Sequence, residues 1–305
     1  MTTSNSRVNS GLTGLVRLMF SAMLLVAGTF TAAQDTGSTT LPSSQAMPGS
    51  GVRMDNPRKP LIAIQTSQGD IQLELFQDAA PQNVQFFLEL AAGQAPVVTG
   101  NNPSAAQPYY DGLTFHRVIR DTLIQAGAPE RAGRQRPVST VIDEINARGL
   151  GLEQQSLLDA SGKPHPWLNI GDQADFKQHV LLPLYRDMNI NNEQALQTQQ
   201  STVLQRLQAM NLLQFHEMVG YRYDGSLSSR RPARGSVMMV NRGPGSNDGE
   251  FFIALTDMPW LIGTTTVIGR VASGLQTVER ISQGPAASTR ILQVRQLNNT
   301  VQTGE

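Results

Sequence analysis

The chain has 305 residues, of which 39% are hydrophobic and 16% charged, and its formal net charge at pH 7 is zero. It carries no basic block and no stripe of Lys and Arg interleaved with aromatic residues, which argues against a nucleic-acid partner. It also contains no cysteine, which excludes disulfides, thiol nucleophiles and thiolate zinc sites. The length predicts one large domain or two small ones.

The amino terminus predicts export. Arg7 and Arg17 precede or border an apolar run, Leu18–Phe30, and Thr31-Ala32-Ala33 then offers small residues for cleavage. The run is shorter than the roughly 20 residues of a transmembrane helix, so residues 1–33 predict a cleaved signal peptide, with an uncleaved anchor as the alternative. We therefore expect an exported protein of the bacterial periplasm, cell envelope or exterior, which suits a chain without disulfides.

Residues 34–60 are rich in Ser, Thr, Gly and Pro and have almost nothing to bury. This composition predicts a disordered linker. The folded part is expected to begin after it, over residues 61–299.

The first folded elements follow in order. Leu61–Thr66 and Ile71–Phe76 alternate apolar and polar residues around a short turn, which predicts a β-hairpin with one buried face. Pro81 opens a helix expected over roughly 81–92. Leu113–Arg120 has strand composition, and period-two alternation places Leu113, Phe115, Arg117 and Ile119 on one side, with His116 pointing away from Arg117.

Residues 128–234 contain two predicted helices. Asn192 is expected to cap a helix from about 193 to 219, and a shorter helix over about 173–188 is expected to kink at Pro183. Together they predict a helical hairpin, at about 150–220, docked on the rest of the domain. It either packs locally or contacts clients or a partner protein. Three histidines here, His165, His179 and His216, lack paired ligand spacing, so we expect no metal site.

The stretch 235–261 has two short apolar runs, Val237–Val240 and Phe251–Leu255, which predict strands on either side of a loop rich in Gly, Pro, Ser and Asn. The loop is a poor phosphate cradle, because it runs into aromatic strand formers instead of the Gly-Lys-Ser/Thr that opens a P-loop helix. Beyond it the pattern predicts a strand, a short helix and a final strand: Thr266–Val271, Leu275–Gln283 and Arg290–Leu297. The sequon Asn298-Asn299-Thr300 has meaning only in a eukaryotic host.

Two blocks of sequence carry a family resemblance. The downstream block has Asn241-Arg242-Gly243-Pro244, Phe251-Phe252-Ile253 and Trp260-Leu261 without gaps. The upstream block reads Phe115-His116-Arg117-Val118-Ile119 and then Leu123-Ile124-Gln125-Ala126-Gly127. In this order and spacing they resemble the signature of the cyclophilins.

The resemblance implies a mainly β fold, a closed antiparallel eight-stranded β-barrel with two capping helices. The helical segment at about 150–220 is then an insertion, because compact cyclophilins join the two blocks with a few dozen residues. The implied function is peptidyl-prolyl cis-trans isomerisation that assists the folding of exported proteins. No cofactor or metal is needed, the partners are proline-containing polypeptides, and we expect a monomer.

Arg117 matches the family arginine that hydrogen-bonds the prolyl nitrogen. The imide bond rotates slowly because the nitrogen lone pair is shared with the carbonyl, and a cation at the nitrogen withdraws that lone pair from resonance. Without the resemblance, Arg117 would be interpreted as a rim arginine whose stem lies on the sheet. The resemblance also implies a set of substrate-binding residues: Leu123, Gln125, Met239, Val240, Asn241, Glu250, Phe252, Trp260 and Leu261.

Three positions depart from the family pattern. Thr122 stands where the pocket wall has an aromatic residue, Thr265 where a histidine is usual, and Glu250 where a glutamine is usual. They leave two alternatives open: a non-catalytic peptide-binding or chaperone module, and a structural envelope protein on the same scaffold.

Overall fold

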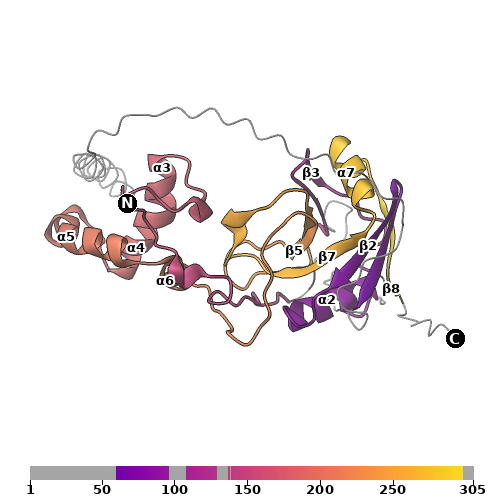
Figure 1. Cartoon of the computed structure of the whole chain (residues 1–305), viewed down its shortest axis with the longest axis horizontal. Coiled ribbons are helices and arrows are strands. Elements are labelled where there is room, and N and C mark those ends of the chain that lie inside the picture. The colour runs from indigo at the N-terminus through magenta and orange to yellow at the C-terminus, as the bar shows by residue number, and fades with distance from the viewer. Residues whose placement is uncertain (1–59, 96–107, 129–136, 138, 298–305) are drawn as a thin grey trace, which may run out of the picture.

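A computed structural model describes residues 60–95, 108–128, 137 and 139–297. The expected signal peptide, nearly all of the linker, and the sequon lie outside these residues. The described chain forms two lobes: a β-sheet lobe with helices α2 and α7, and a helical lobe that holds α3 to α6 (Figure 1).

The β lobe is a single antiparallel sheet with the strand order β3-β4-β6-β5-β7-β2-β1-β8. Its strands are β1 (Leu61–Thr66), β2 (Gly69–Leu75), β3 (Arg117–Ile119), β4 (Leu123–Ala126), β5 (Ser236–Met239), β6 (Phe251–Ala254), β7 (Val267–Ser273) and β8 (Ile291–Leu297). The predicted mainly β fold with eight antiparallel strands is confirmed. The edge strands β3 and β8 do not pair directly. The segments before them meet at an isolated bridge between Thr114 and Arg290, so the strands form a curled half-barrel whose edges are joined by irregular backbone, rather than the closed ring of strands that was predicted.

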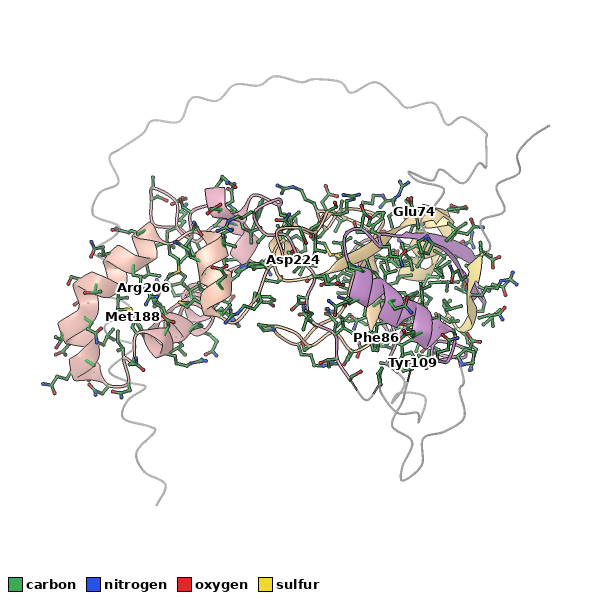
Figure 2. All side chains as sticks on the ribbon, turned by 90° about the horizontal axis from the view of Figure 1, so that it is seen from below. Glu74, Phe86, Tyr109, Met188, Arg206 and Asp224 are labelled. Atoms are coloured by element: carbon green, nitrogen blue, oxygen red, sulfur yellow. The ribbon has the colours of Figure 1, made fainter. Side chains whose placement is uncertain are left out.

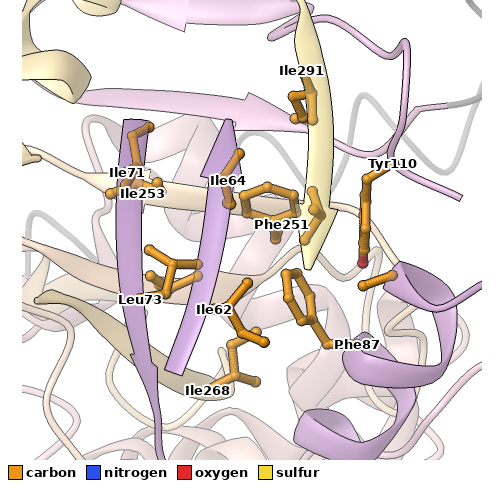
Figure 3. Close-up of a cluster of buried hydrophobic side chains, with 14 of the residues drawn as sticks. Ile62, Ile64, Ile71, Leu73, Phe87, Tyr110, Phe251, Ile253, Ile268 and Ile291 are labelled. Carbon is orange, nitrogen blue, oxygen red and sulfur yellow. The ribbon is translucent and has the colours of Figure 1, made fainter. Parts of the chain in front are cut away.

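Alternation along β6 decides which of its two phenylalanines faces the interior. Phe251 is fully buried, and its ring meets those of Phe87 and Tyr110 edge-on, at centroid distances of 5.5 and 5.4 Å. These rings fill the barrel interior together with isoleucines of β1 (Figure 3). Successive side chains of a strand point to opposite faces, so Phe252 lies on the outer face.

The expected strand Leu113–Arg120 is shorter than predicted, and its alternation is interrupted. Leu113 and Phe115 pack into the barrel core, whereas Arg117 and Ile119 face outward. Only β3, Arg117–Ile119, is regular strand in this segment. Residues 115 and 116 are not in strand conformation, which breaks the period of two. The prediction that all four share one side was wrong, because it assumed continuous pairing.

Two helices cover the barrel from opposite sides: α2 (Pro81–Ala91) and α7 (Leu275–Gln283) (Figure 1). Helix α2 begins after Ala80, which offers no side-chain cap. The Glu144 carboxylate supplies the missing acceptor: it receives the backbone N–H groups of Gln82 and Asn83 at 3.0 and 2.8 Å and the Asn83 side-chain amide at 2.8 Å. A carboxylate at this end also complements the helix dipole.

We expect Glu144→Ala to lower the free energy of unfolding by about 2 kcal/mol, because it removes the acceptor of the Gln82 and Asn83 backbone N–H groups at the start of α2. Chemical denaturation measures the change. Glu89→Ala, on a more exposed face of α2, is the control and should stay within about 0.5 kcal/mol of the wild type. Equal losses in the two variants would contradict this capping role.

The helical lobe has its own hydrophobic cluster, formed by residues between Ile145 and Phe215 together with Ile262. Its elements are η3 (Leu152–Gln154), η4 (Pro166–Leu168), α3 (Gln173–Phe176), the π-turn η5 (Lys177–Leu181), α4 (Leu182–Asp187), α5 (Glu193–Ala209) and α6 (Leu212–Met218). Pro183 lies in the first turn of α4, and the wide π-turn before it accommodates the missing N–H, so the chain stays helical through this region.

The single helix expected over 193–219 is two helices. Met210 has extended backbone angles (φ −77°, ψ 137°), and Asn211 then caps the start of α6. The Asn211 side chain accepts from the Gln214 backbone N–H, and the Gln214 side chain accepts from the Asn211 backbone N–H. An Asn followed three residues later by Gln is a helix-start signal in the sequence itself. The prediction missed it because the apolar stripe continues across the break.

The helical lobe is attached to the barrel beside the chain that follows β6. There η4 contacts η6 (Pro259–Leu261), and the Tyr223 hydroxyl donates to the Gly263 carbonyl at 2.8 Å. Asp224 lies where the two lobes meet (Figure 2). Within the described residues no helix is both long and apolar enough to cross a membrane, and no group of three or more His, Cys, Asp or Glu side chains is placed to hold a metal ion.

Candidate functional site

A row of three side chains crosses neighbouring strands on the outer face of the sheet. Arg117 of β3 pairs with Gln125 of β4, and Gln125 pairs with Phe252 of β6. Side chains directly opposite in an antiparallel sheet share a face. The register therefore brings together a cation, an amide and an aromatic ring that lie up to 135 residues apart in sequence.

This row borders an open pocket of about 380 Å³. Its floor is apolar, because Leu123, Phe252 and Met258 belong to a small hydrophobic cluster on the outer face. Nine of the ten predicted site residues line the pocket: Arg117, Leu123, Gln125, Met239, Val240, Asn241, Phe252, Trp260 and Leu261. No residue of α3 to α6 is among the residues that line the pocket.

Glu250 is the predicted substrate-binding residue that does not line the pocket. Its side chain is 4% exposed and lies behind Gln125, whose Nε2 donates to Glu250 Oε2 at 2.6 Å. Gln125 Oε1 in turn accepts from Arg117 Nη1 at 3.2 Å. Glu250 therefore reaches Arg117 through Gln125 rather than by direct contact.

The Asn241 side chain is committed to two neighbouring groups. Its Nδ2 donates to Asp143 Oδ1 at 3.0 Å and to the Thr264 carbonyl at 2.6 Å. Asp143 also accepts from the Gly245 N–H at 2.8 Å, and burial raises the pKa of its carboxyl. These bonds hold the loop after β5 in place beside the groove.

His116 belongs to the same network as Gln125 and Glu250. Its Nε2 lies 3.5 Å from Glu250 Oε2, and its ring is almost fully buried. Among the described residues, its Nδ1 has no hydrogen-bond partner. His116 therefore faces the back of the site rather than the pocket.

Further residues line the pocket that were not in the predicted set: Ile119, Thr122, Tyr221, Met258, Thr264 and Thr265. Ile119 lies two residues after Arg117 on the same strand, so strand periodicity alone could have found it. Tyr221 comes from the chain that leaves the helical lobe, and no local signal marked it. Tyr221 reaches the pocket wall only through the packing of the helical lobe against the barrel.

This geometry suits the binding of an extended chain with one compact apolar side chain. The floor offers apolar surface, Asn241 lines the wall, and Arg117 places a permanent cation at the rim. The fold and the site together define a curled β-barrel with a guanidinium over an apolar notch.

Comparisons with known proteins place this barrel in a family. Residues 61–301 match the model of the cyclophilin type peptidyl-prolyl cis-trans isomerases. A peptidyl-prolyl cis-trans isomerase-like protein of Rhizopus delemar is 25% identical over 220 residues, 72% of this chain and 78% of that one. An isomerase of Schizosaccharomyces pombe is 26% identical over 72% of this chain and 83% of its own.

A shorter match has higher identity. A probable peptidyl-prolyl cis-trans isomerase A of Mycobacterium bovis is 39% identical over 84 residues, 27% of this chain and 46% of that protein. Because the family model spans most of the sequence, the chain belongs to the cyclophilin-type peptidyl-prolyl cis-trans isomerase family. The predicted family is confirmed, and isomerase activity follows from this membership.

Proposed function

We propose that the protein isomerises Xaa–Pro bonds of exported polypeptides and that Arg117 is the catalytic residue. The observation that carries this proposal is the Arg117 guanidinium, tethered to Gln125 at the rim of an open apolar pocket. The proline ring would occupy the floor beside Phe252. As the peptide bond twists, its nitrogen becomes pyramidal and its lone pair, no longer shared with the carbonyl, localises on the nitrogen. Arg117 can then donate a hydrogen bond to it, which lowers the barrier without any covalent step.

Arginine suits this role because it stays protonated and offers several donors in a fixed plane. One N–H is committed to Gln125, which limits the orientations of the side chain and leaves others free for substrate. A cis-to-trans assay on an Ala-Pro peptide, comparing the wild type with Arg117→Ala, tests the assignment. Equal rates would remove Arg117 from the mechanism.

Action on exported proteins rests on residues 1–33, whose charged start, apolar run and small-residue end are typical of a secretory signal. Expression in a bacterial host, followed by amino-terminal sequencing of the protein from the periplasm and medium, tests it. A chain that begins near residue 34 supports cleavage. Full-length chain confined to the cytoplasm contradicts export.

The helical lobe supports a second role, contact with the client beyond the proline. Tyr221, on the chain that leaves this lobe, lines the same pocket as Arg117. A non-catalytic peptide-binding module would use the same surface. Measuring turnover and peptide affinity in Arg117→Ala distinguishes the two functions. If the protein is an enzyme, this variant should lose most turnover and keep nearly all of its peptide affinity.

Thr122 leaves room in the pocket wall. It is half-buried and lines the pocket, at the place where the family pattern has an aromatic residue. We expect Thr122→Phe to lower the KM for a proline peptide and raise kcat/KM about 10–30-fold, because some 60–80 Å² of added apolar contact contributes about 1.5–2 kcal/mol. Thr122→Val, apolar but no larger, is the control and should change little. A Phe variant no better than Val would show that the proline does not reach this wall.

A further inference from the structure

Behind Arg117 lies a buried carboxylate that the isomerisation chemistry does not require. Glu250 is 4% exposed at its side chain, and it is held from several sides. Arg242 Nη2 donates to Oε1 at 2.8 Å, Gln125 Nε2 donates to Oε2 at 2.6 Å, and His116 Nε2 lies 3.5 Å from Oε2. The backbone is fixed as well, since the Val240 N–H donates to the Glu250 carbonyl at 2.9 Å.

An ionised carboxylate only accepts hydrogen bonds, whereas the Gln125 amide has one donor end and one acceptor end. With Glu250 behind it, Gln125 must turn its NH₂ inward, and its carbonyl then faces the Arg117 guanidinium. A neutral glutamine at position 250 could accept or donate, so both orientations of the Gln125 amide would be populated. In one of them an NH₂ group would face the cation.

We propose that Glu250 is a positioning residue for the reaction: its carboxylate fixes the orientation of Gln125, and Gln125 in turn holds Arg117 toward the substrate nitrogen. Glu250 does not touch substrate, because it lies outside the pocket lining. Arg242 and His116 stabilise the carboxylate in its buried position. This inference rests on the proposed catalytic role of Arg117.

Glu250→Gln is the direct test, because it keeps size and shape and removes the charge. We expect kcat for the Ala-Pro peptide to fall about five- to tenfold, since charge-assisted hydrogen bonds are roughly twice as strong as neutral ones, and the peptide KM to stay within about twofold. An unchanged kcat would overturn the proposal. So would a raised KM with unchanged kcat, because that pattern marks a substrate-binding residue.

Asp248→Asn is the matched control. It neutralises a second, largely buried carboxylate that is also paired with Arg242, so it tests whether any charge change near Arg242 has the same effect. We expect its kcat to equal that of the wild type. A loss equal to that of Glu250→Gln would show that the effect does not depend on Gln125.

A double-variant cycle separates positioning from mere structural support. If Glu250 acts through Arg117, then Glu250→Gln added to Arg117→Ala should cost nothing further, whereas independent effects would multiply. The Gln125 side-chain amide protons give a second readout by NMR: one should be shifted downfield in the wild type and return toward its usual position in Glu250→Gln. Multiplying losses, or an unshifted amide in the wild type, would overturn the inference.

Failure of the inference and failure of the proposed function are distinguishable. If Arg117→Ala lowers kcat and Glu250→Gln does not, only the positioning role falls. If Arg117→Ala leaves kcat unchanged, both fall. Should Glu250→Gln not fold, Gln125→Leu breaks the same link while Glu250 keeps Arg242, and it should give a similar loss of kcat without loss of the fold.

Discussion

Replacing Arg117 by alanine should lower kcat about 10–150-fold, because a hydrogen bond from a charged donor contributes about 1.5–3 kcal/mol when it forms in the transition state. The effect should fall on kcat rather than on KM, since the prolyl nitrogen is a poor acceptor in the planar ground state. The apolar floor around Phe252 and Leu123 is untouched by the change, so peptide affinity should persist. Rates of cis-to-trans conversion at several peptide concentrations give the two constants.

Arg120 provides a matched control for this variant. It is an exposed arginine three residues further along, in the turn after β3, and it does not line the pocket. Arg120→Ala should therefore keep the wild-type kcat, although it makes the same change in net charge. Equal kcat values for the wild type and both variants would leave the non-catalytic binding function as the better account.

Acidification should destabilise the protein through His216, at the joint between the lobes. The residue is 3% exposed, and burial lowers the pKa of its imidazole from the ordinary 6.5 to about 4. The ring lies against Tyr223, with Nδ1 3.2 Å from the hydroxyl, and that hydroxyl donates to Gly263. Because the hydroxyl proton is used on Gly263, Nδ1 must be the donor in its contact with Tyr223. The buried site between the lobes therefore holds the neutral imidazole.

The direction of the effect follows from proton binding. Between pH 6.5 and 4 the unfolded chain binds a proton at this histidine and the folded chain does not. The contribution of His216 to stability is thus fully present above pH 6.5 and is lost as the pH falls toward 4, by up to about 3 kcal/mol. Free energies of unfolding measured by denaturant at pH 7.5 and pH 4.5 test the size and sign.

Two variants isolate His216 from other titrating groups. His216→Leu should lose most of this acid sensitivity, whereas His179→Leu, at an exposed position of the same lobe, should keep it. Asp143 acts in the opposite direction, because burial raises its pKa, so the comparison between variants is more informative than the wild-type curve alone. Identical pH dependence in His216→Leu and the wild type would contradict the assignment.

Most of the pocket could be predicted because its residues lie in two short blocks. Arg117, Leu123 and Gln125 fall within nine positions, and the others lie between Met239 and Leu261, so local spacing was enough to name them. Tyr221 could not be found in this way, because its place depends on how the helical lobe packs. Glu250 was named as a substrate-binding residue, but the structure places it behind Gln125 and outside the pocket lining, a position that depends on strand register and packing rather than on local spacing.

The sequence by itself determined the elements of the barrel. Short-range rules of strand period and turn chemistry were enough for this. They account for the alternation in Leu61–Thr66 and Ile71–Phe76, the proline that opens α2, and the apolar runs around the glycine-rich loop. Only the tertiary structure decided where Leu113–Arg120 changes face and which groups meet behind Arg117. These depend on contacts such as Gln125 with Glu250, 125 residues apart, and such contacts form only once register and packing have brought the strands together.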